Sequence, residues 1–153
     1  DAGASQPHRH LQLLPRSEGE RICARDDWFH CCAAGTTTSA QDPLLRSARV
    51  AAISSTLTGE MLQALYLALA EDLGLGHPST DDCPRGAYNL LITRKWMAMV
   101  RRSREGIRGF SVNALGFAGS LLSTDASDRE WIHRSGPEAL LQAVVDTQDL
   151  KVR

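Results

Sequence analysis

The first clear pattern in the chain is an alternation of period two over residues 8–14. His8, His10 and Gln12 occupy alternate positions, and the residues between them are an arginine and leucines. Successive side chains of a β-strand point to opposite faces, so this spacing predicts a strand that carries both imidazoles and the amide on one polar face.

Helical spacing appears later in the chain. Leucines and a methionine recur at intervals of three and four over residues 61–73, after Thr58 and before Gly74. This pattern predicts an amphipathic helix that stops at the glycine. Residues 127–145 predict two further helices, interrupted at residues 136–137, where a Gly-Pro pair places proline early in the second helix.

Short β-prone runs lie between these helices, at residues 87–92, 96–100 and 109–115. They predict a small antiparallel meander, in which residues 101–108 form a charged, solvated turn. Residues 116–122 are expected to form a short helix that closes on this sheet.

Three segments show no regular period. Residues 26–33 hold two aromatic residues and two adjacent cysteines around His30, and we expect a buried irregular or short extended segment with His30 in the core. Polar, turn-forming residues at 36–47 predict a loop that leads into a helix, and residues 75–85 predict a surface loop.

Composition limits the class of protein. The 153 residues are 42% hydrophobic and 23% charged, which is typical of one globular domain. The formal net charge of -1 provides no general attraction for nucleic acid or for an anionic membrane, and we expect neither as a partner. No apolar stretch reaches the ~18 residues that a membrane span requires.

The cysteines indicate a reducing compartment. Cys23, Cys31, Cys32 and Cys83 form neither a regular disulfide framework nor a Cys-x-x-Cys pair. We therefore expect reduced thiols in a cytoplasmic protein and no metal site.

The polar face of the histidine strand suits nucleotidyl transfer. A neutral imidazole can attack a phosphoryl group and form a covalent intermediate, and histidine is largely neutral near pH 7. The amide of Gln12 can donate a hydrogen bond to a phosphate oxygen, but it cannot shuttle a proton, which favours transfer over hydrolysis. Spacing alone leaves three readings open: a nucleophile, a structural pair and a metal pair.

The wider string around this strand is more specific. Residues 3–12, GASQPHRHLQ, resemble the active-site strand of the ATP adenylyltransferases, or diadenosine tetraphosphate phosphorylases, a branch of the histidine-triad superfamily. A second block resembles the C-terminal segment of the same family: AYNLLITRKWM at residues 87–97 and SVNALGFAG at residues 111–119, with the Gly-Pro pair at 136–137 in the following helix. Two blocks in the same order make a chance resemblance improbable.

The resemblance implies an α+β fold, with a histidine-triad-like antiparallel sheet and flanking helices. Residues 1–35 would hold the histidine-strand segment of the catalytic domain, 36–86 a loop and helix connector, 87–146 the C-terminal family segment, and 147–153 a tail. Family members are longer, and the chain opens without methionine, so we expect a fragment whose N-terminal half would complete the nucleotide pocket.

The resemblance also implies roles for single residues. His10 would be the adenylylated nucleophile, His8 would position it, and Gln12 would bind phosphate. The implied substrate-binding residues are Ser5, Gln6, Asn89, Thr93, Lys95 and Asn113. For Lys95 an exposed turn position, and for Asn113 a structural cap, remain open alternatives.

The implied reaction is phosphorolysis of diadenosine tetraphosphate to ATP and ADP, or its reverse, through an adenylyl-histidine. Its partners would be the dinucleoside polyphosphate, ATP, ADP and phosphate, with Mg²⁺ as a possible companion of the nucleotide and no organic cofactor. Two alternatives remain: uridylyl transfer between hexose 1-phosphates, and a non-catalytic nucleotide-binding half.

Overall fold

A three-stranded antiparallel sheet forms the centre of the protein in the computed structural model, which describes residues 11–36, 42–77, 80–81, 83–123 and 125–145. The strands are β1 (Ala48–Ala52), β2 (Ala87–Ile92) and β3 (Trp96–Arg102), in the order β1-β3-β2. Each outer strand pairs with β3 in antiparallel register, so that both Ala48 and Asn89 lie opposite Val100.

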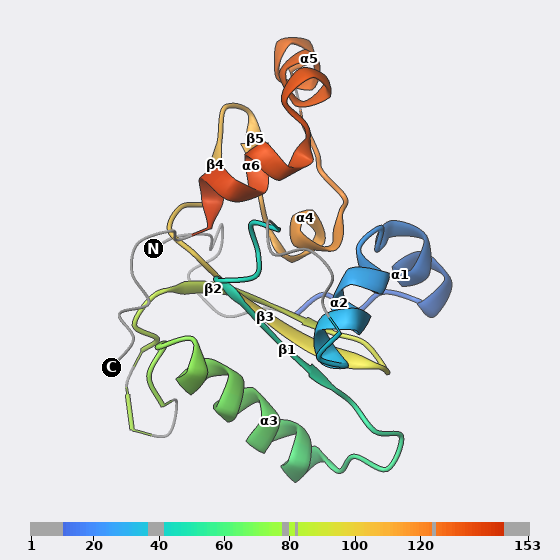
Figure 1. Cartoon of the computed structure of the whole chain (residues 1–153), viewed down its shortest axis with the longest axis vertical. Helices are drawn as coiled ribbons and strands as arrows, with labels where there is room; N and C mark the ends of the chain where they lie inside the picture. The colour runs from blue at the N-terminus through green and yellow to red at the C-terminus, as the bar shows by residue number, and fades with distance from the viewer. Residues whose placement is uncertain (1–10, 37–41, 78–79, 82, 124, 146–153) are drawn as a thin grey trace.

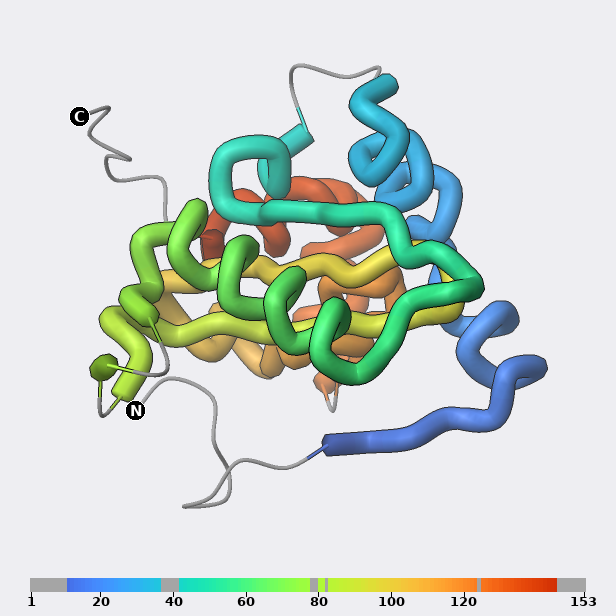
Figure 2. The backbone as a smooth tube through the Cα atoms, turned by 90° about the horizontal axis from the view of Figure 1, so that it is seen from below, coloured from blue at the N-terminus to red at the C-terminus, as the bar shows by residue number. Residues whose placement is uncertain are grey.

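One face of the sheet is covered by α3 (Gly59–Asp72), as Figures 1 and 2 show. Successive side chains of β3 point to opposite faces of the sheet. Met97 and Met99 lie on the α3 side, where they pack against Leu69 of the helix and Leu73 just after it. Thr58 caps the helix, because its Oγ1 accepts a hydrogen bond from the Met61 amide at 3.3 Å. The predicted helix is confirmed, including its stop at Gly74, which has a φ of +66°.

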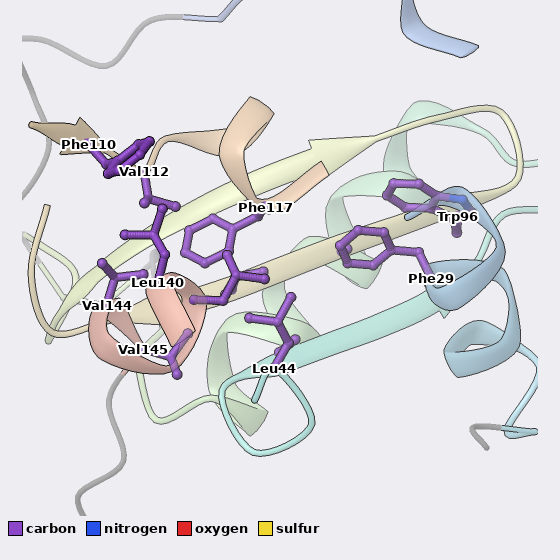
Figure 3. Close-up of a cluster of buried hydrophobic side chains, with 13 residues drawn as sticks. Phe29, Leu44, Trp96, Phe110, Val112, Phe117, Leu140, Val144 and Val145 are labelled. Atoms are coloured by element: carbon purple, nitrogen blue, oxygen red, sulfur yellow. The ribbon is translucent and has the colours of Figure 1, made fainter. Parts of the chain in front are cut away.

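The opposite face carries the larger core. The helices on this side are α2 (Asp26–Ala33), α4 (Ala114–Ala118), α5 (Ala126–Ser135) and α6 (Pro137–Val144). Figure 3 shows the buried side chains of this core, in which Phe29 of α2 stacks on Trp96 of β3 with ring centroids 4.6 Å apart. The break between α5 and α6 at Gly136 is confirmed, with Pro137 at the start of α6.

The meander prediction is partly wrong. β2 and β3 form the expected hairpin, but the third strand of the sheet is β1, which the sequence pattern did not predict. Residues expected to form the third run instead make β5 (Phe110–Ser111), which pairs with β4 (Gly106–Ile107) in a separate two-stranded sheet, and then begin α4. The loop before residue 48 therefore leads into a strand and not into a helix.

The predicted strand over residues 8–14 is not found where it can be checked. Residues 11–15 have no regular structure, and Leu11 and Leu13 are 84% and 93% exposed. A strand needs a partner, and no neighbouring strand lies beside these residues in the described part of the chain. The segment leads into the short helix α1 (Arg16–Ile22), and its isolation is visible in Figure 2.

Residues 26–33 form a helix, so the expectation of an irregular or extended segment was wrong. Asp26 and Asp27 lie in its first turn, where acidic side chains stabilise the positive end of a helix. Phe29 is fully buried against the sheet, whereas His30 points to the exposed side and is not the core histidine that was expected.

Candidate functional site

Only part of the candidate site around the histidine motif lies within the residues that the structure describes. His8, His10, Ser5 and Gln6 lie outside the described residues. Gln12 is exposed in the extended segment before α1 and is not part of the sheet. The structure therefore describes the second block of the candidate site in detail, and of the first block only Gln12.

Thr93 and Lys95 lie in the tight turn between β2 and β3. The Thr93 hydroxyl accepts hydrogen bonds from the amides of Lys95 and Trp96, each at 3.1 Å, and donates one to the Trp96 carbonyl at 3.2 Å. These hydrogen bonds close the turn between the two strands.

Asp26 connects this turn to α2. Its Oδ1 accepts a hydrogen bond from the Trp96 indole at 2.8 Å, and its Oδ2 lies 3.6 Å from the Lys95 ammonium. The Lys95 side chain is 64% exposed, so the pair is weak and the ammonium stays accessible to an anion from solvent. Asp26 was not among the predicted site residues, because its contacts with Lys95 and Trp96 join segments that are far apart in sequence.

Asn89 has an unusual environment in the middle of β2. Its Oδ1 is buried and accepts no hydrogen bond from any residue that the structure describes. A buried acceptor without a donor costs about 1–3 kcal/mol, so this oxygen has a capacity that a ligand or water could satisfy. Four residues of extended chain, about 13 Å, separate Asn89 from Thr93.

Asn113 acts as the N-cap of α4. Its Oδ1 accepts a hydrogen bond from the Gly116 amide at 3.1 Å. This helix packs on β2, the strand of Asn89. The two asparagines thus belong to neighbouring elements, while Thr93 and Lys95 lie at the tip of the hairpin.

A buried ion pair that the sequence did not reveal supports α2. Arg25 Nη2 lies 2.6 Å from Asp42 Oδ2, with side chains 15% and 11% exposed, and the guanidinium lies 4.7 Å from the centre of the Trp28 ring. The partners are far apart in sequence, and no local spacing could have paired them. Their burial indicates that Arg25 holds the loop before β1 in place.

The basic run that was expected to be a solvated turn is instead partly structural. Arg102 is buried at the end of β3, where its Nη1 donates to the Val112 carbonyl at 2.6 Å. Burial lowers the pKa of this guanidinium, against a weaker opposing effect of Glu105. The Ser103 amide donates a hydrogen bond to the Val144 carbonyl at 3.0 Å, so this residue too takes part in backbone contacts at the end of β3.

Nothing in the described ranges assembles a metal centre, since no group of three histidine, cysteine or acidic side chains comes together there. Cys23 is partly buried, and burial and then the nearby Asp26 carboxylate raise the pKa of its thiol. A surface hollow lies on the α3 side of the sheet, lined by Tyr66, Ala70, Leu75, Asp81, Cys83, Pro84 and Tyr88. It contains none of the predicted substrate-binding residues.

Together these features define the class of protein as an α+β domain in which an antiparallel hairpin and a capped short helix carry the polar residues of the second block. The model of the ATP adenylyltransferase C-terminal domain matches residues 29–146. The chain therefore belongs to the ATP adenylyltransferase family, which confirms the resemblance and the expected α+β fold.

A solved structure supports the same fold. The chain is similar to yeast Ap4A phosphorylase Apa2, with a TM-score of 0.53 and 21% sequence identity. The similarity covers 65% of this chain and 36% of that protein, so the chain spans about a third of the relative's length. A search of curated proteins gave no match.

No helix in the described ranges is both long enough and apolar enough to cross a membrane.

Proposed function

We propose that the protein takes part in adenylyl transfer, with His10 as the residue that carries the adenylyl group. The observation that carries this proposal is the match of residues 29–146 to the ATP adenylyltransferase C-terminal domain, preceded by the His-x-His-x-Gln motif at residues 8–12. Its substrates would be diadenosine tetraphosphate and phosphate.

The proposed reaction has two displacement steps. An imidazole nitrogen of His10 attacks one α-phosphorus of diadenosine tetraphosphate, a phosphorus–nitrogen bond forms, and the bond to the bridging oxygen breaks, so that ATP leaves with the electron pair. An oxygen of inorganic phosphate then attacks the same phosphorus. The phosphorus–nitrogen bond breaks, and ADP and the free histidine result.

Other residues of the motif would support these steps. His8 would orient the His10 ring, and Gln12, with Ser5 and Gln6, would donate hydrogen bonds to phosphate oxygens. Any Mg²⁺ would arrive with the polyphosphate, bound mainly through substrate oxygens and water.

The second block would contribute to binding. The unmet buried oxygen of Asn89 suits a donor of the nucleotide, such as a ribose hydroxyl or an adenine amino group. The exposed Lys95 ammonium suits a polyphosphate oxygen, which would compete with Asp26 for it. Thr93 and Asn113 would affect binding indirectly, because Thr93 stabilises the turn that carries Lys95 and Asn113 caps α4, which packs on β2.

The test is to trap the intermediate. The protein is incubated with diadenosine tetraphosphate, and its intact mass is measured at neutral pH, because phosphoramidates of histidine are labile in acid. We expect a mass increase of one adenylyl group, with release of ATP and discharge to ADP on addition of phosphate. His10→Ala should abolish the adduct.

His133→Ala is the matched control, because His133 is exposed on α5 and should leave the adduct unchanged. An unmodified wild-type protein that releases no ATP would refute the proposal. Incubation with a uridine diphosphate hexose serves as the substrate comparison, since a uridylyl adduct in place of the adenylyl adduct would favour transfer between hexose phosphates.

A further inference from the structure

The chain between α1 and α2 is fastened to the C-terminal end of α4. The Ser120 hydroxyl donates a hydrogen bond to the Ile22 carbonyl at 2.9 Å, and the Arg25 amide donates one to the Ala118 carbonyl at 3.1 Å. These two bonds join positions almost a hundred residues apart in sequence. They connect a segment that precedes the family-domain match with the helix that follows Asn113.

This attachment matters for the position of α1, because the helix makes few other contacts with the described part of the protein. None of its residues is buried. Cys23, directly after the helix, packs against the edge of the larger core, and the two hydrogen bonds flank it in sequence. The position of α1, and of the segment that leads back to Gln12, thus depends on the contact with the end of α4.

The backbone at Gly119 is shaped for this contact. Its φ of +113° lies in the left-handed region that side chains disfavour, and a Cβ there would lie 2.8 Å from the Ala24 Cβ. The same turn closes α4, since the Ser120 amide donates to the Leu115 carbonyl at 2.9 Å. Gly119 therefore allows the close approach, and the turn that it makes presents the Ser120 hydroxyl to Ile22.

The contact links the two blocks of the candidate site through a short, continuous path. α4 begins at the Asn113 cap and packs on β2, which carries Asn89, and it ends at the turn that holds Ile22 and Arg25. From there α1 leads to Gln12 of the histidine motif. The end of α4 is thus the point where the second block contacts the chain coming from the first.

We propose that Gly119 and Ser120 are positioning residues, which hold α1, the helix that follows the histidine motif in the chain, in a fixed place relative to β2 and α4. This inference rests on the proposed function for its catalytic consequence, but not for the attachment itself. Neither residue touches the reacting atoms.

The experiment uses the whole chain and the variant Ser120→Ala, which removes the hydroxyl without adding bulk. Amide hydrogen exchange over residues 16–25 should accelerate about fivefold or more, because the lost hydrogen bond lowers the free energy of opening of this segment. Ser120→Thr, which keeps the hydroxyl, should restore the wild-type exchange. Gly119→Ala should accelerate exchange further, since it adds a clash and a strained φ.

Ser123→Ala is the control, because Ser123 also donates a hydroxyl-to-carbonyl hydrogen bond, to Asp125 at 3.0 Å, and accepts one from the Asp125 amide at 3.3 Å, both outside residues 16–25. It should leave exchange over residues 16–25 unchanged. Exchange in Ser120→Ala that equals the wild type would overturn the attachment, as would acceleration of the same size in the control.

The second measurement is single-turnover adenylylation of His10 at increasing nucleotide concentration. Ser120→Ala should lower the maximal rate about tenfold and leave the half-saturating concentration unchanged, with recovery in Ser120→Thr, since orientation affects the transfer step more than binding. An unaltered rate despite faster exchange would overturn the positioning role. The hydrogen-exchange experiment tests the attachment of α1 to α4 and does not require an active enzyme. A wild-type chain that forms no adenylyl-enzyme would therefore count only against the proposed function.

Discussion

The indole of Trp96 makes one of the most informative single contacts in the protein. Its Nε1 donates to Asp26 at 2.8 Å, while the Nε1 of Trp28 is buried and has no acceptor among the described residues. We expect Trp96→Phe to lower the free energy of unfolding by about 1 kcal/mol more than Trp28→Phe, because only the first replacement removes a hydrogen bond. Urea denaturation followed by circular dichroism measures both.

Both variants replace an indole with a phenyl ring, but Trp28→Phe also shortens the ring that lies 4.7 Å from the Arg25 guanidinium. A loss in Trp96→Phe no larger than that in Trp28→Phe would contradict the expected contribution of the Trp96–Asp26 bond. A third variant, Asp26→Asn, keeps an acceptor for the indole and removes the charge opposite Lys95. It should change stability less than Trp96→Phe, because an exposed ion pair contributes little.

Among the single residues, those whose roles are local could be anticipated from sequence. Asn113 was recognised as a possible cap, because asparagine before an apolar run commonly fills that position. Asp26 and the Arg25–Asp42 pair could not be found, since their contacts join segments that only the fold brings together. The roles of His8 and His10 stay predictions.

The helix α3 shows when sequence determines an element reliably. Its threonine cap, apolar spacing and terminal glycine all point to the same boundaries, and each acts within a few residues. We expect Thr58→Ala to destabilise the protein by about 1 kcal/mol, and Thr58→Ser to be almost neutral, because the hydroxyl accepts the Met61 amide. Thermal unfolding of the two variants measures this difference, and equal stability would show that the cap contributes nothing.

The elements that sequence missed are those set by distant partners. The run ARVAA at β1 is rich in alanine, which has low strand propensity, and it becomes a strand because it pairs along β3. The aromatic residues at 28–29 are typical of a buried strand, and only the packing of Phe29 on Trp96 in the fold shows that they belong to the helix α2. The reverse applies to residues 11–14, whose alternation fits a strand but which have no strand beside them in the described part of the chain.

At the scale of the whole molecule, β3 joins two cores. Trp96, Ala98 and Val100 face the larger core, and Met97 and Met99 face α3, all of them at most 1% exposed. If either layer lost its contact with β3, the buried side chains on the face that it covers would be exposed to water. The domain should therefore unfold as one cooperative unit.

Met99→Ala tests this coupling from the α3 side. The buried methionine leaves a cavity when it is shortened, and we expect a loss of about 2–5 kcal/mol in the free energy of unfolding. Met61→Ala is the control, because Met61 is 51% exposed and its loss should cost under about 1 kcal/mol. Fluorescence of the tryptophans reports the larger core, and far-ultraviolet circular dichroism reports all helices. The two transitions should shift together in Met99→Ala, and a tryptophan transition that stays at the wild-type midpoint would show that the two cores unfold separately.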